Sequence, residues 1–394
     1  MTASLDADPR LGTPDAAALR PRPDDPARLE AYLPSPCVQN HAAQLTFLPN
    51  GDLACVWFGG TQEGIPDISV YLSRLVPGAE SWSEPVKLSD DPTRSEQNPL
   101  LFPTPGGDLW LLHTAQRGGN QDTALVRRRI SRDHGQTWTQ ADTLFEPGAG
   151  YGVFVRHPPV IHLGGAWLIP GWRCPTPPRG PWVGDDDVSF VRRSTDQGRS
   201  WTDILVPGST GCVHMSIVPR SGGALLALFR SRWADFVHIS RSDDAGLTWS
   251  PPEPTTLPNN NSSIQALALE DGRIALVLNP SSAADATARR EGLYDDIGDA
   301  TPPPVRAGRT AFWGAPRAPL TLALSADDGR TWPIQRDIET GDGFCMTNNS
   351  KDRLNRELSY PSIAQSPDGA LHIAFTYFRR AIKYVRLPLD WPER

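Results

Sequence analysis

An eight-residue pattern, S-x-D-x-G-x-[ST]-W, occurs four times in this chain. The copies cover residues 131–138, 194–201, 242–249 and 325–332, and a run typical of a short strand precedes each of them. Ser and Asp can hydrogen-bond to the nearby backbone, Gly tolerates a left-handed conformation, and Trp can anchor a turn against a sheet. Each copy therefore predicts a hairpin turn. Its recurrence indicates a fold built from repeated units.

The composition fits a protein made of many short strands. The 394 residues include 40 Pro, 34 Gly and 13 Trp, which is typical of strands joined by tight turns. The net charge is −7 with acidic and basic residues interspersed, and no apolar stretch is long enough to span a membrane. We expect neither a nucleic-acid partner nor a membrane partner.

The cysteines indicate a reducing compartment. Five of them are scattered without paired spacing or a neighbouring histidine cluster, and the first residues do not have the pattern of a secretory signal. This pattern favours reduced thiols in a cytoplasmic protein and gives no reason to predict a metal site or a cofactor. The five are Cys37, Cys55, Cys174, Cys212 and Cys345.

The repeat unit is larger than the eight-residue pattern. An apolar run, a Gly/Asp turn, a second and a third strand, the eight-residue pattern and a fourth strand follow one another. Equivalent first strands begin near residues 41, 98, 157, 214 and 263, at intervals of roughly 50 to 60 residues, and a last one begins near residue 360. Six four-stranded units arranged as an all-β propeller fit this spacing.

We expect one domain over residues 29–394 and a mobile or loosely packed arm over residues 1–28. Residues 281–312 form an insertion in blade five, rich in Ala, Asp, Arg and Pro, and a seventh blade would have to lie inside it. The last blade shows only three strands. A segment around residues 30–36 can supply the fourth and close the ring.

Polar residues cluster at the predicted starts of the innermost strands, which meet around the axis of a propeller. Strands that enter a core have no packing reason for so many amides, imidazoles and guanidinium groups, although polar ends can also simply cap solvated strands. Their recurrence on nearly every blade predicts a polar binding funnel. The residues are Asn40, His41, Gln97, Asn98, Arg156, His157, His214, residues 259–263 including Asn261, and Tyr360.

The repeated pattern resembles the Asp-box, or BNR, repeat of the sialidase superfamily. This resemblance implies a six-bladed β-propeller in which the four Asp boxes are structural. Sialidases use three arginines to bind a sugar carboxylate, a tyrosine nucleophile activated by a glutamate, and an aspartate general acid. Tyr360 in Ser359-Tyr-Pro-Ser362 matches the tyrosine, and Arg230 and Arg317 match the second and third arginines.

The chain departs from the sialidase pattern at two of these positions. His214 stands where the family has its glutamate, and Asn40-His41 stands where the first arginine is expected. Arg156, from another blade, is a candidate to supply the missing arginine and so bring the number to three. Asp67, in the acidic loop 63–67, is the best candidate for the general acid.

These residues predict an enzyme that acts on a terminal acidic sugar of a glycan or oligosaccharide. We expect a retaining exo-glycosidase with Tyr360 as nucleophile, His214 as its proton partner, His41 as a further acid or base, and Arg230 with Arg317 on the carboxylate. Amide side chains suit hydroxyl recognition; those predicted for this role are Asn40, Gln97, Asn98 and Asn261. A uronate lyase that uses the same His, Tyr and Arg groups, and a carbohydrate-binding propeller without catalysis, remain alternatives.

Overall fold

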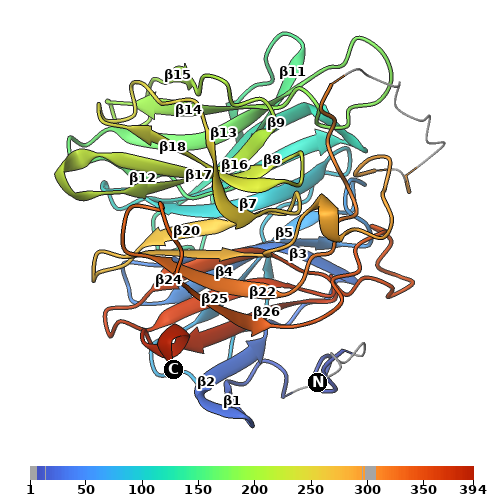
Figure 1. The fold of residues 1–394 in the computed structure, drawn as a ribbon. Coiled ribbons are helices and arrows are strands. Elements are labelled where there is room, and N and C mark those ends of the chain that lie inside the picture. The colour runs from blue at the N-terminus through green and yellow to red at the C-terminus, as the bar shows by residue number, and fades with distance from the viewer. Residues whose placement is uncertain (1–6, 14, 295, 298–307) are drawn as a thin grey trace.

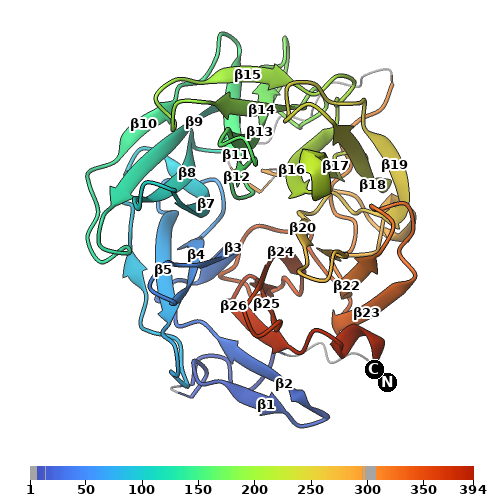
Figure 2. The same ribbon diagram turned by 90° about the vertical axis from the view of Figure 1, so that its left-hand side faces the viewer.

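The computed structural model describes residues 7–13, 15–294, 296–297 and 308–394, and within them the chain forms six antiparallel sheets arranged as the blades of a propeller. Figure 1 shows the propeller from the side, and Figure 2 shows the blades around a central axis. The predicted all-β, six-bladed fold is confirmed. Among the described residues the only helices are three short 3-10 turns, at Ser221–Gly223, Ala283–Asp285 and Trp391–Glu393.

The strands of blades one to five run from the axis outward in chain order, whereas the outer strands of blade six come from the N-terminal segment. Blade one contains β3 (Gln39–Phe47), β4 (Leu53–Gly60), β5 (Ser69–Leu75) and β6 (Val86–Lys87). Blade two contains β7 (Ser95–Pro103), β8 (Leu109–Arg117), β9 (Asn120–Ser131) and β10 (Asp142–Phe145). Blade three contains β11 (Tyr151–Val155), β12 (Val160–Ile161), β13 (Trp167–Pro175), β14 (Val188–Ser194) and β15 (Thr202–Leu205).

The second half of the ring repeats this order. Blade four contains β16 (Cys212–Pro219), β17 (Leu225–Ser231), β18 (Phe236–Ser242) and β19 (Glu253–Pro258). Blade five contains β20 (Gln265–Ala268), β21 (Ile274–Leu278), β22 (Leu320–Ser325) and β23 (Ile334–Glu339). Blade six contains β24 (Leu358–Gln365), β25 (Leu371–Tyr377) and β26 (Ala381–Leu387), followed by β2 (Asp25–Tyr32) and β1 (Arg20–Arg22).

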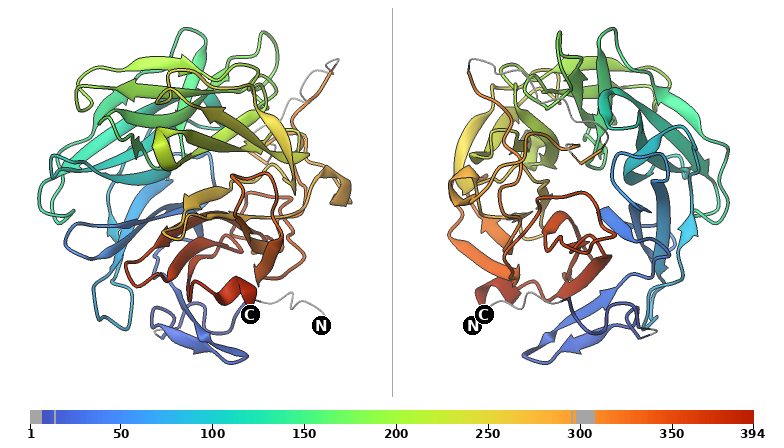
Figure 3. Two further views of the ribbon diagram at one scale, coloured as in Figure 1. Left: turned by 60° about the vertical axis from the view of Figure 1, so that its left-hand side comes forward. Right: turned by 90° about the vertical axis from the view of Figure 1, so that its right-hand side faces the viewer.

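The N-terminal segment closes the ring. Strand β2 pairs antiparallel with β26, and the N-terminal strands lie beside the C-terminal blade in Figures 1 and 3. The predicted boundary between residues 28 and 29 falls inside β2, so the second half of the expected loose arm is part of a sheet. Buried charges fix this edge, because Glu30 accepts from Arg28 at 2.6 Å and from Lys383 at 3.1 Å.

The four Asp boxes form turns between the third and fourth strands of blades two to five, and each turn is closed by local hydrogen bonds. In the first box, Asp133 Oδ1 accepts from Thr137 N at 2.9 Å, and Asp133 Oδ2 accepts from Thr137 Oγ1 at 2.5 Å. Ser131 Oγ accepts from Gly135 N at 2.6 Å. The boxes that begin at residues 194, 242 and 325 repeat these bonds.

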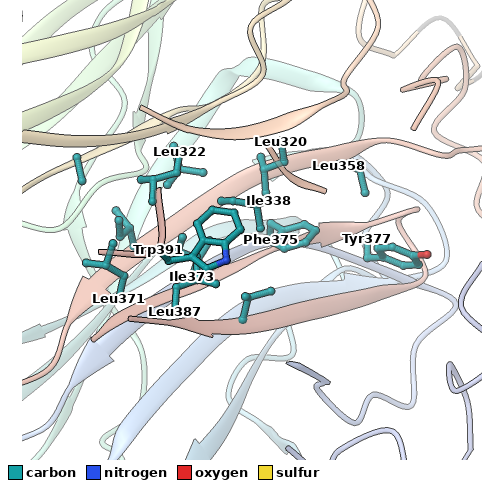
Figure 4. Packing of buried hydrophobic residues seen from close by; sticks show 14 of the residues in the cluster. Leu320, Leu322, Ile338, Leu358, Leu371, Ile373, Phe375, Tyr377, Leu387 and Trp391 are labelled. Carbon is teal, nitrogen blue, oxygen red and sulfur yellow. The ribbon is translucent and has the colours of Figure 1, made fainter. Parts of the chain in front are cut away.

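Apolar side chains fill the spaces between neighbouring blades. Figure 4 shows the cluster between blades five and six, where Leu320 and Leu322 of β22 face Ile373 and Phe375 of β25 and Trp391 packs beside Ile373. A middle strand that is apolar throughout buries both faces of its blade: in β21, Ala275 and Val277 belong to this cluster, and Ile274, Leu276 and Leu278 belong to the cluster on the other side. This packing holds the inner strands in a fixed ring around the axis.

The insertion in blade five crosses the face of the ring where the innermost strands begin. Tyr294 Oη accepts from Gln116 Nε2 at 3.0 Å and from Gln121 Nε2 at 3.1 Å, both in blade two. Trp313 Nε1 donates to the Val183 carbonyl in blade three at 3.0 Å. Residues 295 and 298–307 of the predicted insertion lie outside the described residues. The described part joins several blades across the pore.

Candidate active site

The innermost strands share an unusual backbone feature at the pore. In four blades a non-glycine residue of this strand has a left-handed backbone, and in blade five such a residue stands four positions before the strand: Ala42 (φ 61°), Asn98 (φ 49°), His214 (φ 51°), Tyr360 (φ 52°) and, in blade five, Asn261 (φ 57°). At Ala42, Asn98, His214 and Tyr360 the pairing with the second strand also shifts register. Such bulges re-aim side chains, and left-handed non-glycine residues are strained. Four of the predicted site residues stand on these positions.

Tyr360 lies among three arginines from three other blades. The guanidinium carbons of Arg156, Arg230 and Arg317 lie 5.4, 5.6 and 5.7 Å from the centre of its ring. Arg230 Nη1 donates to the Tyr360 hydroxyl at 2.6 Å. The structure therefore brings together the tyrosine and the two arginines that the sequence placed at one pocket.

Arg230 is a buried cation without an acidic partner. Its Nε donates to Asn261 Oδ1 at 2.8 Å, and its Nη1 also lies 3.3 Å from His214 Nε2. Its Nη2 is buried and has no hydrogen-bond partner among the described residues, and none of their carboxylates forms an ion pair with it. Burial lowers the pKa of Arg230 to about 9. A buried, partly unsatisfied guanidinium favours a bound anion.

Arg317, by contrast, belongs to a chain of alternating charges. Its Nη1 donates to Glu357 Oε2 at 2.9 Å, Glu357 Oε1 accepts from Arg379 Nε at 2.5 Å, and Arg379 Nη1 donates to Glu63 Oε2 at 2.6 Å. Burial alone would raise the pKa of Glu357, but Arg379 and Arg317 hold it below its usual value. The carboxylate is ionised and fixes both arginines.

Sequence reasoning missed Glu357 and Arg379. Phe378 and Arg379 both have φ of 54° and turn the hairpin between β25 and β26, where Asn or Gly is the usual choice. This strained turn brings Arg379 to Glu63 and Glu357. A single sequence gives no signal for it, because Phe-Arg is not a typical turn dipeptide.

Two buried histidines flank the tyrosine. His214 stacks on Trp172 at 4.4 Å, and its Nδ1 lies 3.0 Å from Ser263 Oγ. His41 lies 4.1 Å from Tyr360 between ring centres. Burial, with the nearby arginines, holds the pKa of both histidines well below the usual 6.5. Both imidazoles are therefore neutral near pH 7 and can accept a proton.

The contact of His214 with Tyr360 differs from the expected direct pairing. The two rings meet edge to face at 5.6 Å, and Arg230 Nη1 contacts both His214 Nε2 and the phenol oxygen. The guanidinium group thus stands between imidazole and phenol. His41 Nδ1 is bonded to Thr376 Oγ1 at 2.8 Å, while its Nε2 has no hydrogen-bond partner among the described residues.

Arg156 reaches the pore but does not offer a free guanidinium group. Its Nη2 donates to the carbonyls of Ala43 at 3.0 Å and Tyr360 at 3.2 Å, and its Nη1 donates to Ala42 at 3.3 Å. Burial lowers its pKa to about 10. The predicted third clamp arginine instead joins blades one and six at the axis, because its donors are taken by backbone oxygens.

Asp67 does not join the cluster. It is exposed, and its Oδ2 accepts from Thr61 N at 3.1 Å and from Thr61 Oγ1 at 2.5 Å, which closes the loop on itself. Glu63, four residues earlier in the same loop, is buried and contacts Arg379. The loop 63–67 therefore reaches the cluster through Glu63 and not through the predicted Asp67.

The predicted amides have different surroundings. Asn40 uses its side chain within the fold, accepting from Trp57 Nε1 at 2.9 Å and donating to the Arg380 carbonyl at 2.9 Å. Gln97 Nε2 donates to Ser95 Oγ at 3.0 Å. Asn261 binds Arg230, and its Nδ2 donates to the Phe312 carbonyl of the insertion at 2.8 Å. Asn98 stands on its bulge without a side-chain hydrogen bond to another described residue.

The described residues include neither a metal-binding cluster nor a helix able to span a membrane. No group of three or more His, Cys, Asp or Glu side chains in the described parts of the chain is arranged to hold a metal ion. No described helix is long and apolar enough to cross a membrane. All five cysteines are free.

Comparison with known proteins identifies a BNR repeat-like family and a sialidase as similar to this chain. A family profile described as a BNR repeat-like domain matches residues 51–373. A sialidase from Micromonospora viridifaciens is 23% identical over 403 residues, covering 88% of this chain and 51% of that protein. The chain thus spans about half the length of this curated relative.

Solved structures share the propeller fold at low sequence identity. The Hadza microbial sialidase Hz136 has a TM-score of 0.64 at 14% identity, covering 90% of this chain and 66% of that one. The intramolecular trans-sialidase from Ruminococcus gnavus has a TM-score of 0.65 at 12% identity, covering 90% and 95%. A protein of unknown function from Dyadobacter fermentans has a TM-score of 0.65 at 14% identity, covering 92% and 99%.

Proposed function

Because the chain belongs to the family of BNR repeat-like domain proteins, we propose that it is a sialidase-like glycosidase acting on the terminal acidic sugar of a glycan or oligosaccharide. One observation carries the proposal. The buried guanidinium group of Arg230 contacts the Tyr360 hydroxyl at 2.6 Å, has an unsatisfied Nη2, and forms no ion pair with a described carboxylate. A substrate carboxylate would supply the missing partner beside a candidate nucleophile.

In this proposal the two matched arginines differ in role. Arg230 is the principal partner of the sugar carboxylate, because Arg317 is already paired with Glu357. Arg317 and Arg379 keep Glu357 ionised, and the network keeps the positive charge around Tyr360 in place. Preorganised charges of this kind are effective in a buried site, because they need no reorganisation during the reaction.

The chemistry assigned to Tyr360 is attack of its oxygen on the anomeric carbon. The phenol must lose its proton as the bond forms. Neutral His41 and His214 are the nearby acceptors, and Arg230 stabilises the developing phenolate. In place of Asp67, Glu63 is the carboxyl group of the loop 63–67 that lies at the cluster; it can protonate the leaving oxygen only after it has left its ion pair with Arg379 and taken up a proton. Water then releases the sugar with its configuration retained.

A uronate lyase is the second candidate, and the histidines favour it. A neutral imidazole where the family has a glutamate is suited to take the proton alpha to a clamped carboxylate. Tyr360 would then protonate the leaving oxygen, and elimination would leave a carbon–carbon double bond. Hydrolysis instead adds water and gives a saturated sugar, so the product separates the two reactions.

Tyr360→Phe tests the assignment. It keeps the ring among the arginines but removes the reactive oxygen, so turnover of acidic glycosides should fall by several orders of magnitude while binding changes little. Tyr384→Phe is the matched control, since this buried hydroxyl is bonded to His372 away from the arginines.

The wild-type product decides between the functions. Saturated sugar that carries one solvent oxygen supports the glycosidase. An ultraviolet-absorbing unsaturated product would replace it with the lyase. Tight binding of acidic sugars without turnover across a broad glycan panel would contradict both and indicate a binding protein.

A further inference from the structure

A second concave site lies at the junction of blades six and one. A cavity of about 810 Å³ opens between the N-terminal segment, residues 32–38 at the start of blade one, and the loop 350–353 that precedes β24. Pro34, Pro36 and Pro85 line one part of it, and Ser350, Arg353 and Arg380 line another. We call this cavity the junction groove. Its volume is sufficient for a sugar of one or two rings.

The arginine part of the junction groove lacks acidic partners. Neither Arg353 nor Arg380 forms an ion pair with a described carboxylate, whereas nearby Arg356 is paired with Asp342 at 2.7 Å. Burial and the neighbouring Arg353 lower the pKa of Arg380. Glu84, also in the lining, is exposed to solvent. An anion is therefore expected at the arginines.

The wall of the junction groove formed by Ser350, Arg353 and Arg380 also contains donors without hydrogen-bond partners among the described residues. Arg380 Nε and Ser350 Oγ are shielded from solvent and have no hydrogen-bond partner among the described residues, and Ser350 as a whole is only 3% exposed. Buried polar groups without partners are rare in folded proteins and call for an explanation such as a bound ligand.

This wall is built rigidly. Arg380 Nη2 donates to the Arg353 carbonyl at 2.7 Å, and the Arg380 carbonyl accepts from Asn40 Nδ2 at 2.9 Å. Arg353 itself has a left-handed backbone with φ of 55°. Strained positions held by surrounding contacts are concentrated at binding sites.

The junction groove is separate from the Tyr360 cluster but shares two chain segments with it. Arg379 contacts Glu63 and Glu357, whereas its neighbour Arg380 lines the junction groove. Asn349 pairs with Gln62 beside Glu63, whereas Ser350 lines the junction groove. The two sites therefore use neighbouring residues of the same two segments.

We propose that the junction groove is a second binding site, specific for a sugar carboxylate held by Arg353, Arg380 and Ser350 with the sugar ring against the prolines. The carboxylate belongs either to a separate acidic sugar or to a further acidic unit of a chain bound at Tyr360. Binding here does not depend on catalysis at Tyr360, so it can be tested even if the protein has no turnover.

Cys37 provides a local readout. It lines the junction groove and is half-buried, whereas the other four cysteines are buried. Burial raises the pKa of the Cys37 thiol, so its reaction with neutral iodoacetamide is best followed near about pH 8.5 by mass spectrometry. The probes are glucuronic acid, an acidic disaccharide, and glucose as the neutral control.

We expect acidic sugar, but not glucose, to slow alkylation of Cys37 several-fold. Arg353→Glu should abolish this protection; the side chain is exposed and makes no hydrogen bond or ion pair with described residues, so the fold should persist, as a thermal melt can verify. If glucuronic acid still protects Cys37 in the Arg230→Ala variant, the junction groove binds a separate acidic sugar. If only the disaccharide protects Cys37, and this protection is lost in both Arg230→Ala and Arg353→Glu, one acidic chain spans both sites.

Three results would overturn the proposal. They are equal protection by glucose, no protection by any acidic sugar, and protection that survives Arg353→Glu in a folded protein. None of these results bears on turnover at Tyr360, so failure here remains distinct from failure of the proposed glycosidase.

Discussion

The Asp-box turns and the Tyr360 cluster are built in opposite ways. Each box satisfies its polar groups with partners four residues away, in the same geometry four times. The cluster joins side chains that are far apart in the chain: Arg379 and Glu63 are separated by 316 residues. The cluster also leaves Arg230 Nη2 without a hydrogen-bond partner among the described residues, and two of its residues, His214 and Tyr360, have a strained left-handed backbone. Repetition secures the fold, and departures from it create the site.

The largest effect should follow removal of the acid that joins two arginines of the cluster. Glu357→Ala leaves Arg317 and Arg379 buried without their shared carboxylate, which should cost about 3 to 5 kcal/mol of unfolding free energy. Urea denaturation measures this loss. Asp142→Ala removes an exposed partner of Arg128 and should cost less than about 1 kcal/mol. If the two variants lost similar amounts of unfolding free energy, the buried carboxylate of Glu357 would matter no more to stability than an exposed one.

Acid should weaken the cluster before it affects the boxes. His41, His157 and His214 have folded pKa values well below 6.5, so the unfolded chain binds protons that the folded chain does not. Stability should therefore be constant above about pH 7 and fall below about pH 6.5, by up to about 1.4 kcal/mol per pH unit for each histidine.

Urea titrations between about pH 7.5 and 5 measure this slope. Hydrogen bonds from Thr331 and Ser325 keep the pKa of the box carboxylate Asp327 near 2, so the boxes do not titrate in this range. Stability that is flat down to pH 5 would show that the buried histidines are not neutral.

Within the boxes, the glycine should be the most sensitive position. Gly198 has φ of 80°, and an added Cβ would lie 2.7 Å from Trp110 and 3.0 Å from Trp167. Gly198→Ala should cost about 1 to 3 kcal/mol by crowding and backbone strain. Gly78 has a similar φ of 78° with nothing within 4 Å, so Gly78→Ala isolates the backbone contribution. Equal costs would show that packing against the tryptophans contributes nothing.

The smallest effect should come from a box charge. Asp327→Asn keeps an oxygen for Thr331 N, and its amide can donate to Thr331 Oγ1, so the melting temperature should barely change. Turnover should equal that of the wild type, because the box contributes no group to the pore. A large loss of activity with unchanged stability would contradict the conclusion that the boxes are purely structural.

The sequence predicts the repeated parts well, because their signals are local. The Ser-x-Asp-x-Gly turns and the flanking apolar runs identify the blades, and the resemblance to sialidases leads to Tyr360, Arg230 and Arg317. Which carboxylate of loop 63–67 faces the pore depends on the bond between Asp67 and Thr61, which composition does not reveal. Whether Arg156 is free depends on the carbonyls that the bulges at Ala42 and Tyr360 turn toward it.

The pairing of β2 with β26 has a consequence for synthesis of the protein. Glu30 lies opposite Val385, so β2, which is synthesised before blades one to five, must wait for β26, which is synthesised after them. Blades one to five can form on the nascent chain while β2 still presents an unpaired edge, and such edges invite pairing between chains. Translation of β26 is thus the event that removes this hazard, and it also fixes the hairpin that carries Arg379.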